Sequence, residues 1–290
     1  MTIAAATSWG AARMNIASDS PRLDAEVLLS FLFHRDRAWI LTHANDELRA
    51  RDWTRFRRLV AKRRGHWPVP YLTGRAEFFG FSLVVSPAVL IPRPATELLV
   101  QAILDRVSPN DPLRIADVGT GSGAIALALA SRLPRATVIA SDTSSKALSI
   151  ARRNARHLGL RTRIIFRHGS LLIPYRPSDH LSIIVANLPY LTSRQLQHPS
   201  LRHEPRVALY GGGGGRQVLQ QFIKQASAWP GVVGLGLELD PTQVVTVRRW
   251  WRTAWPQKTV TPISDGRKTR GLLLWTKSSH PRSPGVQVRS

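Results

Sequence analysis

The stretch SIIVANLPYLT, residues 182–192, joins an apolar run to residues that could do chemistry. Ile183 to Ala186 predict a buried strand, and Asn187 to Tyr190 follow it directly. An amide side chain and a nearby backbone carbonyl offer two acceptors for the two hydrogens of a planar –NH2 group. Such a nitrogen is a poor nucleophile because its lone pair is delocalised, and holding both hydrogens would align it for attack. A proline-stiffened turn with a core tyrosine is the alternative.

A glycine-rich turn, DVGTGSG, runs from Asp117 to Gly123 between a predicted strand and a predicted helix. Glycines let the backbone approach a ligand, and a helix N-terminus offers unpaired N–H groups. Asp142 ends the next predicted strand, where a carboxylate can accept both hydroxyls of a ribose. The spacing differs from G-x-G-x-x-G, so we expect S-adenosylmethionine rather than a dinucleotide. A purely structural turn is the alternative.

Strand and helix patterns alternate from Leu113 onward, which predicts an α/β fold with a parallel, doubly wound sheet. The carboxyl ends of the strands in such a sheet face the ligand crevice. We therefore expect Asn187 to point at the bound nucleoside.

The chain before this sheet has a different pattern. Helical periodicity covers residues 21–64 and places Leu23, Val27, Leu28 and Phe31 near one face of a helix. Alternating residues around Gly80 predict a β-hairpin. The expected organisation is a helical N-terminal domain at 1–72, a hairpin linker at 73–92, an α/β domain at 93–277 and a disordered basic tail at 278–290.

The composition of the chain limits the kinds of partner and the cellular compartment that we expect. The 290 residues carry 41 Lys and Arg against 18 Asp and Glu, a net charge of +23. This charge favours a partner rich in nucleic acid, such as the ribosome, although arginines spread over solvated faces explain it equally well. The chain has no cysteine, and its nine His show no ligand spacing, so we expect no metal site. No apolar run is long enough for a membrane span, and we expect a cytoplasmic monomer.

Taken in order, the motifs resemble the HemK/PrmC family of methyltransferases that modify the Gly-Gly-Gln glutamine of peptide-chain release factors. The similarity extends to about Lys277. The segments that carry it are RLDAEVLL, PVPYLTGRAEFFG, LIPRPATE, ADVGTGSGAIALALA, NLPY in place of Asn-Pro-Pro-Tyr, and EPRVALYGGGGG. The resemblance implies a Rossmann-like, S-adenosylmethionine-dependent methyltransferase domain, preceded by a small all-α domain that contacts the release factor.

The resemblance also implies roles for single residues. In the cofactor site, Asp142 would hold the ribose hydroxyls, and Ser170 and Leu171 would lie at the adenine. The methionine and ribose would be lined by Gly119, Thr120, Gly121, Ser122 and Gly123.

For the substrate, the resemblance assigns the tetrapeptide. Asn187 would accept one hydrogen of the glutamine amide, and the backbone carbonyl of Leu188 would accept the other. Pro189 and Tyr190 would shape the slot for the glutamine side chain.

Five positions depart from the family pattern. Leu188 replaces a proline whose ring would fix the carbonyl direction, Ala95 and Gly214 replace aspartates, Ser170 replaces an acidic residue, and Leu171 replaces an aromatic one. Two alternatives follow. One is an adenine-amino methyltransferase of nucleic acid, which uses a related motif, and the other is a non-catalytic relative that binds the cofactor or a translation factor.

Overall fold

The computed structural model describes residues 1–276, so the expected basic tail lies outside the described residues. The chain starts with helices α1 (Ile3–Met14), α2 (Pro21–Phe33), α3 (Arg37–Thr42), α4 (Ala50–Arg64) and α5 (Val69–Thr73), followed by strands β1 (Arg75–Phe78) and β2 (Phe81–Val84). The later helices are α6 (Pro94–Leu104), α7 (Ala124–Arg132), α8 (Ser145–His157), α9 (Arg206–Leu209), α10 (Gln217–Ala226) and α11 (Val244–Ala254). The later strands are β3 (Arg114–Val118), β4 (Thr137–Asp142), β5 (Ile164–His168), β6 (Ile183–Ala186), β7 (Gly234–Glu238), β8 (Lys258–Ser264) and β9 (Thr269–Thr276). Short 3-10 helices lie in the connections: η1 (Arg161–Arg163), η2 (Pro177–Asp179), η3 (Gln195–Gln197), η4 (Pro199–Leu201), η5 (Gly213–Gly215) and η6 (Pro241–Gln243).

The α/β prediction is confirmed by a seven-stranded sheet with the order β5-β4-β3-β6-β7-β9-β8. The first five strands in this order run parallel, and β9 runs antiparallel to both β7 and β8. The chain builds outward from β3 to β5 on one side and from β6 to β7 on the other. The order therefore reverses between β3 and β6, which is where doubly wound sheets bind ligands.

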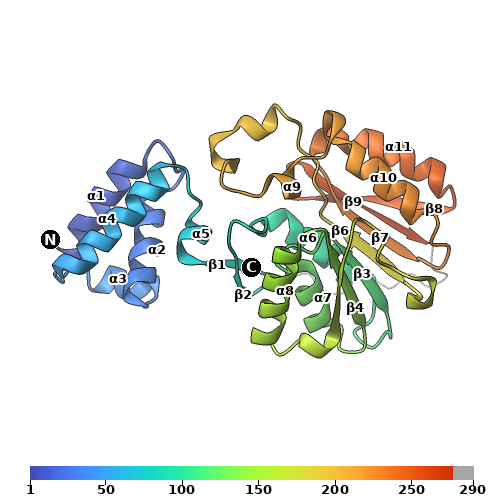
Figure 1. Ribbon diagram of the computed structural model, residues 1–290, viewed down its shortest axis with the longest axis horizontal. Helices are drawn as coiled ribbons and strands as arrows, with labels where there is room; N and C mark the ends of the chain where they lie inside the picture. Colours follow the sequence, from blue (N-terminus) through green and yellow to red (C-terminus); the bar gives the residue numbers. More distant parts are fainter. Residues whose placement is uncertain (277–290) are drawn as a thin grey trace.

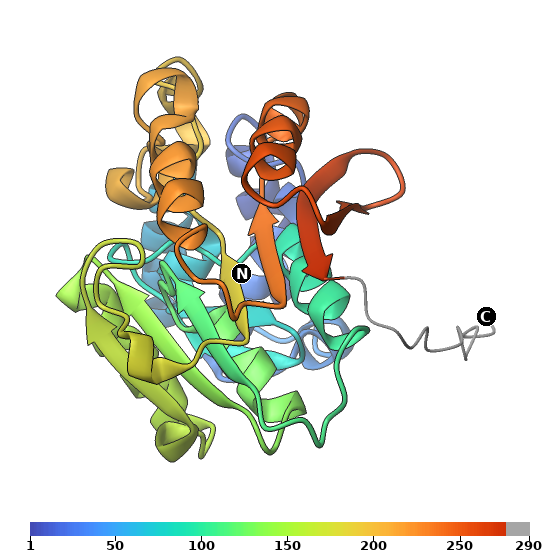
Figure 2. The ribbon, with the colours of Figure 1, turned by 90° about the vertical axis from the view of Figure 1, so that its right-hand side faces the viewer.

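Both faces of the sheet are covered, as the apolar run in β6 requires. All four residues of β6 are buried. Ile183 and Val185 belong to the core beneath α6 and α7, whereas Ile184 and Ala186 belong to the core beneath α10 and α11. Figure 2 shows α10 and α11 together on one side of the sheet.

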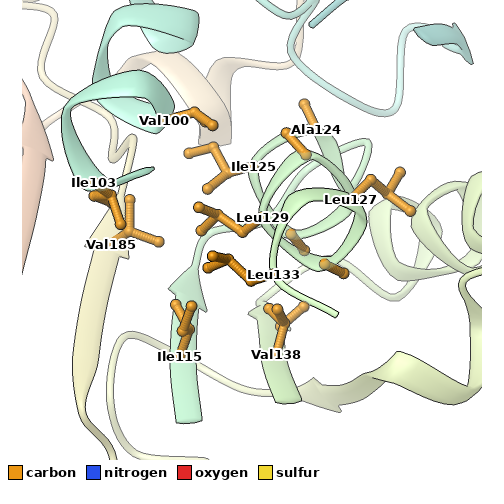
Figure 3. Packing of buried hydrophobic residues seen from close by; sticks show 14 of the residues in the cluster. Val100, Ile103, Ile115, Ala124, Ile125, Leu127, Leu129, Leu133, Val138 and Val185 are labelled. Atoms are coloured by element: carbon orange, nitrogen blue, oxygen red, sulfur yellow. The ribbon is translucent and has the colours of Figure 1, made fainter. Parts of the chain in front are cut away.

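The core between α7 and the sheet is built from branched aliphatic side chains. Ile125, Leu129 and Leu133 form a row that faces Ile115 of β3 and Val138 of β4 (Figure 3). This row holds the helix that follows the glycine turn against the two strands beside it. The position of the turn is therefore fixed by packing on both sides.

The N-terminal helices form a separate core of their own, well away from the sheet (Figure 1). The predicted face of α2 is wrong in part, because Leu23 is 42% exposed while Ala25, Leu29 and Leu32 are buried. Glu26 is also buried on this helix, where it accepts hydrogen bonds from Arg22 and Arg37. Glu26 lies on the buried face of α2 although it is a charged residue. A pattern based on apolar residues alone therefore predicts a different face.

The hairpin β1–β2 joins the two parts of the chain and is fastened to the sheet domain by Asn154 of α8. The Asn154 Oδ1 accepts the N–H of Val84 at 2.8 Å, and its Nδ2 donates to the Val84 carbonyl at 3.0 Å. The same Nδ2 donates to the carbonyl of Ser122, in the glycine turn, at 2.9 Å. One buried amide therefore ties the linker hairpin to the turn.

We expect Asn154→Ala to lower the free energy of unfolding by about 2–4 kcal/mol, because three hydrogen bonds are lost and buried backbone groups are left unpaired. Chemical denaturation monitored by circular dichroism measures this. The matched control is Asn110→Ala at an exposed asparagine, which should stay within about 0.5 kcal/mol of the wild type. Equal losses in the two variants would contradict this role.

Candidate functional site

A cavity of about 530 Å³ opens at the carboxyl edge of the sheet, where β3 and β6 end. Its lining comes from the turn after β3, the ends of β4 and β5, the tetrapeptide after β6, residues 88–92, and α9. The volume lies within the range of small-molecule sites. The cavity therefore lies at the reversal of strand order.

The turn after β3 is shaped by glycines that take left-handed backbone angles. Gly119, Gly121 and Gly123 have φ of +76°, +56° and +87°, which other residues adopt only at a cost. A Cβ on Gly119 would also lie 3.3 Å from the Leu188 Cδ2. The backbone of the turn is thus exposed to the cavity on one side and touches the tetrapeptide on the other.

Asp142 organises this turn as well as facing the cavity. Its Oδ2 accepts the N–H of Gly121 at 2.9 Å, and its Oδ1 accepts the N–H of Ser144 at 2.8 Å. Burial raises the pKa of the Asp142 carboxyl, and these two hydrogen bonds oppose the rise. Each carboxylate oxygen keeps a further lone pair, so Asp142 can still accept hydroxyl groups from a ligand.

Asp117 is a second carboxyl group, fully buried beneath the turn. Its Oδ2 accepts the Thr120 hydroxyl at 2.6 Å and the N–H of Ala126 at 3.0 Å. Its Oδ1 has no hydrogen-bond partner among residues 1–276. Burial raises the pKa of Asp117 to about 7, against the lowering effect of those two hydrogen bonds. This group therefore titrates close to neutral pH.

The tetrapeptide after β6 lies against the glycine turn because β6 pairs with β3, Ala186 beside Val118. Asn187 lines the cavity, and its Nδ2 donates to the Thr96 hydroxyl at 3.1 Å. Leu188 is buried, with 4% of its surface exposed, and packs in the core with the strand residues. The leucine side chain thus fills the interior instead of projecting into solvent.

The backbone after the tetrapeptide is clamped by the glycine-rich segment of residues 211–215. A Cβ on Gly215 would collide with the Tyr190 carbonyl oxygen, so only glycine fits there. Gln243 donates to the carbonyls of both Tyr190 and Gly215, at 3.0 and 2.8 Å. A Cβ on Gly214 would meet only the Arg216 side chain, at 3.5 Å, so this departure from the family pattern disturbs no close backbone contact.

Most of the residues predicted for the site meet in this cavity. Its lining includes Gly119, Thr120, Gly121, Ser122, Asp142, Ser170, Leu171, Asn187, Leu188 and Pro189. Two predicted residues do not line it. Gly123 caps the N-terminus of α7 beneath the turn, and the Tyr190 hydroxyl instead donates to Glu238 at 3.3 Å.

Thr96 and Glu238 were missed by the sequence interpretation. Thr96 lies within LIPRPATE at the start of α6 and lines the cavity. Glu238 ends the buried strand β7, so it carries the same signal as Asn187, a polar residue at the carboxyl end of an apolar strand. Arg206 and Tyr210 also line the cavity, but the segment that holds them has no periodic pattern.

The residues present fit a nucleoside ligand. Left-handed glycines leave room at the turn that a Cβ would fill, and Asp142 keeps acceptor capacity for paired hydroxyls. Pro189 and Leu171 add apolar surface, which suits a flat ring.

Two family models match the chain. The model described as the PrmC N-terminal domain covers residues 5–74, and the model described as the methyltransferase small domain covers residues 93–234. No helix within residues 1–276 combines the length and the apolar character needed to cross a bilayer.

Several similar curated proteins carry the name release factor glutamine methyltransferase. The Moorella thermoacetica protein is 42% identical over 219 residues, which is 75% of each chain. The Escherichia coli protein is 41% identical over 212 residues, 72% of this chain and 76% of its own. The Deinococcus radiodurans protein is 37% identical over 257 residues, 86% of this chain and 89% of its own.

Solved structures show a likeness of fold. The catalytic domain of human METTL16 in complex with a MAT2A 3′UTR hairpin aligns with a TM-score of 0.58 and 17% identity, covering 85% of this chain and 88% of that one. The N-terminal domain of human METTL16 in complex with SAH aligns with a TM-score of 0.52 and 17% identity, covering 68% and 76%.

The buried position of Asp117 predicts that the free energy of unfolding depends on pH. The pKa of Asp117 is near 7 in the folded protein and near 4 in the unfolded chain. Between pH 4 and pH 7 its carboxyl is therefore protonated in the folded protein but ionised in the unfolded chain. The stability contributed by this group is therefore lost as pH rises from about 4 to about 7. Asp117→Asn keeps an acceptor for Thr120 and removes the titration.

Between about pH 4 and pH 7, we expect the free energy of unfolding of the wild type to fall more than that of Asp117→Asn. The difference between the two proteins should change by up to about 4 kcal/mol over this range. Urea denaturation at pH 4.5, 5.5, 6.5 and 7.5 measures it, and carboxyls that do not interact with Asp117 cancel in the comparison. Parallel stability curves for the two proteins would contradict the assignment.

Proposed function

The chain belongs to the release factor glutamine methyltransferase family, and from this premise we propose that it methylates the glutamine side-chain amide in the Gly-Gly-Gln motif of a release factor. The methyl group would come from S-adenosylmethionine. The observation that carries the proposal is the meeting of two motifs in one cavity, the glycine turn with Asp142 and the tetrapeptide that begins with Asn187.

The task of this chain's residues is to orient a weakly nucleophilic nitrogen. Asn187 Oδ1 and the Leu188 carbonyl would each accept one hydrogen of the substrate amide. The nitrogen lone pair would then be directed perpendicular to the plane of the amide. S-adenosylmethionine, when bound, supplies a methyl group on a positively charged sulfur.

In the transfer, the amide nitrogen would gain a bond to the methyl carbon as the bond from that carbon to the sulfonium sulfur breaks. The sulfur would leave as a neutral thioether, and the nitrogen would lose one proton. Of the described residues that line the cavity, Asp142 alone carries a carboxylate, and it already holds the glycine turn. Water can accept this proton, which becomes acidic only as the new bond forms.

We propose that the chain divides at the predicted boundaries and that residues 1–72 dock the release factor. The N-terminal helices have a core of their own. They meet the α/β part through the stacking of Trp67 on His203, and they meet the linker through the hydrogen bond of the Tyr71 hydroxyl to the Val89 carbonyl at 2.5 Å. A docked factor could then reach the cavity, which Val89 also lines.

We also propose a monomer that works in the cytoplasm and meets its factor near the ribosome. Three exposed arginines, Arg248, Arg249 and Arg252, line a shallow hollow on α11 together with Val245. Such a basic surface suits an anionic polymer such as ribosomal RNA.

The test of the function is transfer of a labelled methyl group. We expect incubation with labelled S-adenosylmethionine and a release factor to place label on the Gly-Gly-Gln glutamine, located by mass spectrometry. Asn187→Ala should abolish transfer while leaving cofactor binding within about threefold, and Asn110→Ala should transfer as the wild type does. Label on adenine in nucleic acid would favour the adenine-amino alternative, and cofactor binding without any transfer would favour a non-catalytic relative.

A second prediction concerns cofactor affinity. We expect Asp142→Ala to weaken S-adenosylmethionine binding by about 1.5–3 kcal/mol, the range for a hydrogen bond to a charged group. Isothermal titration calorimetry measures this, and Asp19→Ala at an exposed aspartate is the control. Since Asp142 also holds the Gly121 N–H, a small fall in thermal stability should accompany the loss. Unchanged affinity would remove Asp142 from the cofactor site.

A further inference from the structure

A buried carboxylate lies directly behind the Asn187 amide. Glu238 is the last residue of β7, and only 3% of its surface is exposed. β7 pairs with β6 in a register that sets Leu237 beside Ala186. Glu238 and Asn187, the residues that follow this pair, therefore leave the same edge of the sheet side by side.

Two hydroxyl groups donate to this carboxylate. The Thr96 hydroxyl donates to Oε2 at 2.5 Å, and the Tyr190 hydroxyl donates to Oε1 at 3.3 Å. Burial raises the pKa of Glu238, whereas the polar side chains of Thr96, Tyr190 and Asn187 around it oppose the rise. Both hydroxyls are the donors in these contacts, so each turns its single hydrogen towards Glu238.

This direction determines how the Asn187 amide is turned. The hydrogen of the Thr96 hydroxyl is committed to Glu238, so Thr96 offers Asn187 only lone pairs. Asn187 Nδ2 donates to that oxygen at 3.1 Å. A reversed amide would place Oδ1 against the Thr96 oxygen with no hydrogen between them, which is unfavourable in a buried site. Oδ1 is therefore left free to accept a hydrogen from another group.

We propose that Glu238 is a positioning residue that acts through Thr96 to hold the Asn187 amide with Oδ1 facing the substrate nitrogen. The inference rests on the proposed function, because it gives Oδ1 the task of accepting a hydrogen from the glutamine amide. Tyr190 has a similar role, because its hydroxyl connects the last residue of the tetrapeptide to the same carboxylate. Both ends of the tetrapeptide are therefore held by Glu238.

The first experiment reads the orientation of Asn187 without any activity. The side-chain NH2 signal of Asn187 in the 15N-labelled full-length protein is identified by its loss in Asn187→Ala. We expect Glu238→Gln to shift this signal and to speed its exchange with water, because an amide at position 238 can donate as well as accept and no longer fixes the Thr96 hydrogen. Thr96→Val should do the same, and Thr96→Ser, which keeps the hydroxyl, should not.

The second experiment measures methyl transfer in the same variants. Glu238→Gln and Thr96→Val should lower kcat by about 10- to 100-fold, with the S-adenosylmethionine Kd and the KM for the release factor within about threefold of the wild type. Thr96→Ser should stay within about threefold in kcat. The double variant Glu238→Gln/Thr96→Val should be no more than about threefold slower than Thr96→Val, because both changes break the same connection.

The outcomes separate this inference from the proposed function. An Asn187 signal that is unchanged in Glu238→Gln would overturn the inference, whatever the activity. Losses in kcat that multiply in the double variant would overturn it too, because they would show that Glu238 acts independently of Thr96. A wild-type protein that transfers no methyl group, but whose Asn187 signal responds as described, would refute the function and leave the positioning role standing. If Glu238→Gln does not fold, the Thr96→Val and Thr96→Ser pair decides between the same outcomes.

Discussion

The parallel pairing of β3 with β6 is the constraint on which the site depends. Val118 lies beside Ala186 in this register, so the glycine turn and the tetrapeptide leave the sheet at the same level. A shift by one residue would turn Asn187 to the other face of the sheet. The alternation in β6, with Ile183 and Val185 on one face and Ile184 and Ala186 on the other, resists such a shift because both faces are buried.

Burying polar groups next to this pairing carries an energetic cost, and the structure offsets it by connecting them. Glu238, Thr96, Asn187 and Tyr190 form one hydrogen-bonded chain at the carboxyl edge of β6 and β7. A buried network of this kind holds its members in a single arrangement when every member has a partner. The same network that makes the burial tolerable therefore also orients the Asn187 amide.

The sequence predicts those parts of the fold and site that depend on local pattern. The doubly wound sheet follows from the strand and helix alternation, and Asp142 and Asn187 were found because each is a polar residue at the end of an apolar strand. The sequence could not indicate which face of α2 is buried, since Glu26 is held by Arg37, eleven residues away. Glu238 was missed for a similar reason: its partners Thr96 and Tyr190 are distant in sequence and meet it only in the folded chain.

At Leu188, tertiary contacts replace the restriction that a proline ring would place on the backbone angles. A proline at this position would restrict φ by its own ring, whereas leucine leaves the backbone angles to the surroundings. The segment is held by its surroundings: the Leu188 side chain is buried in the core, the Asn187 amide before it donates to Thr96, and the Tyr190 carbonyl after it accepts from Gln243. A Cβ on Gly119 would lie 3.3 Å from the Leu188 Cδ2, so the side chain that replaces the ring lies beside the glycine turn. The direction of the Leu188 carbonyl is therefore set by its neighbours in space, and the substitution is compatible with an ordered site.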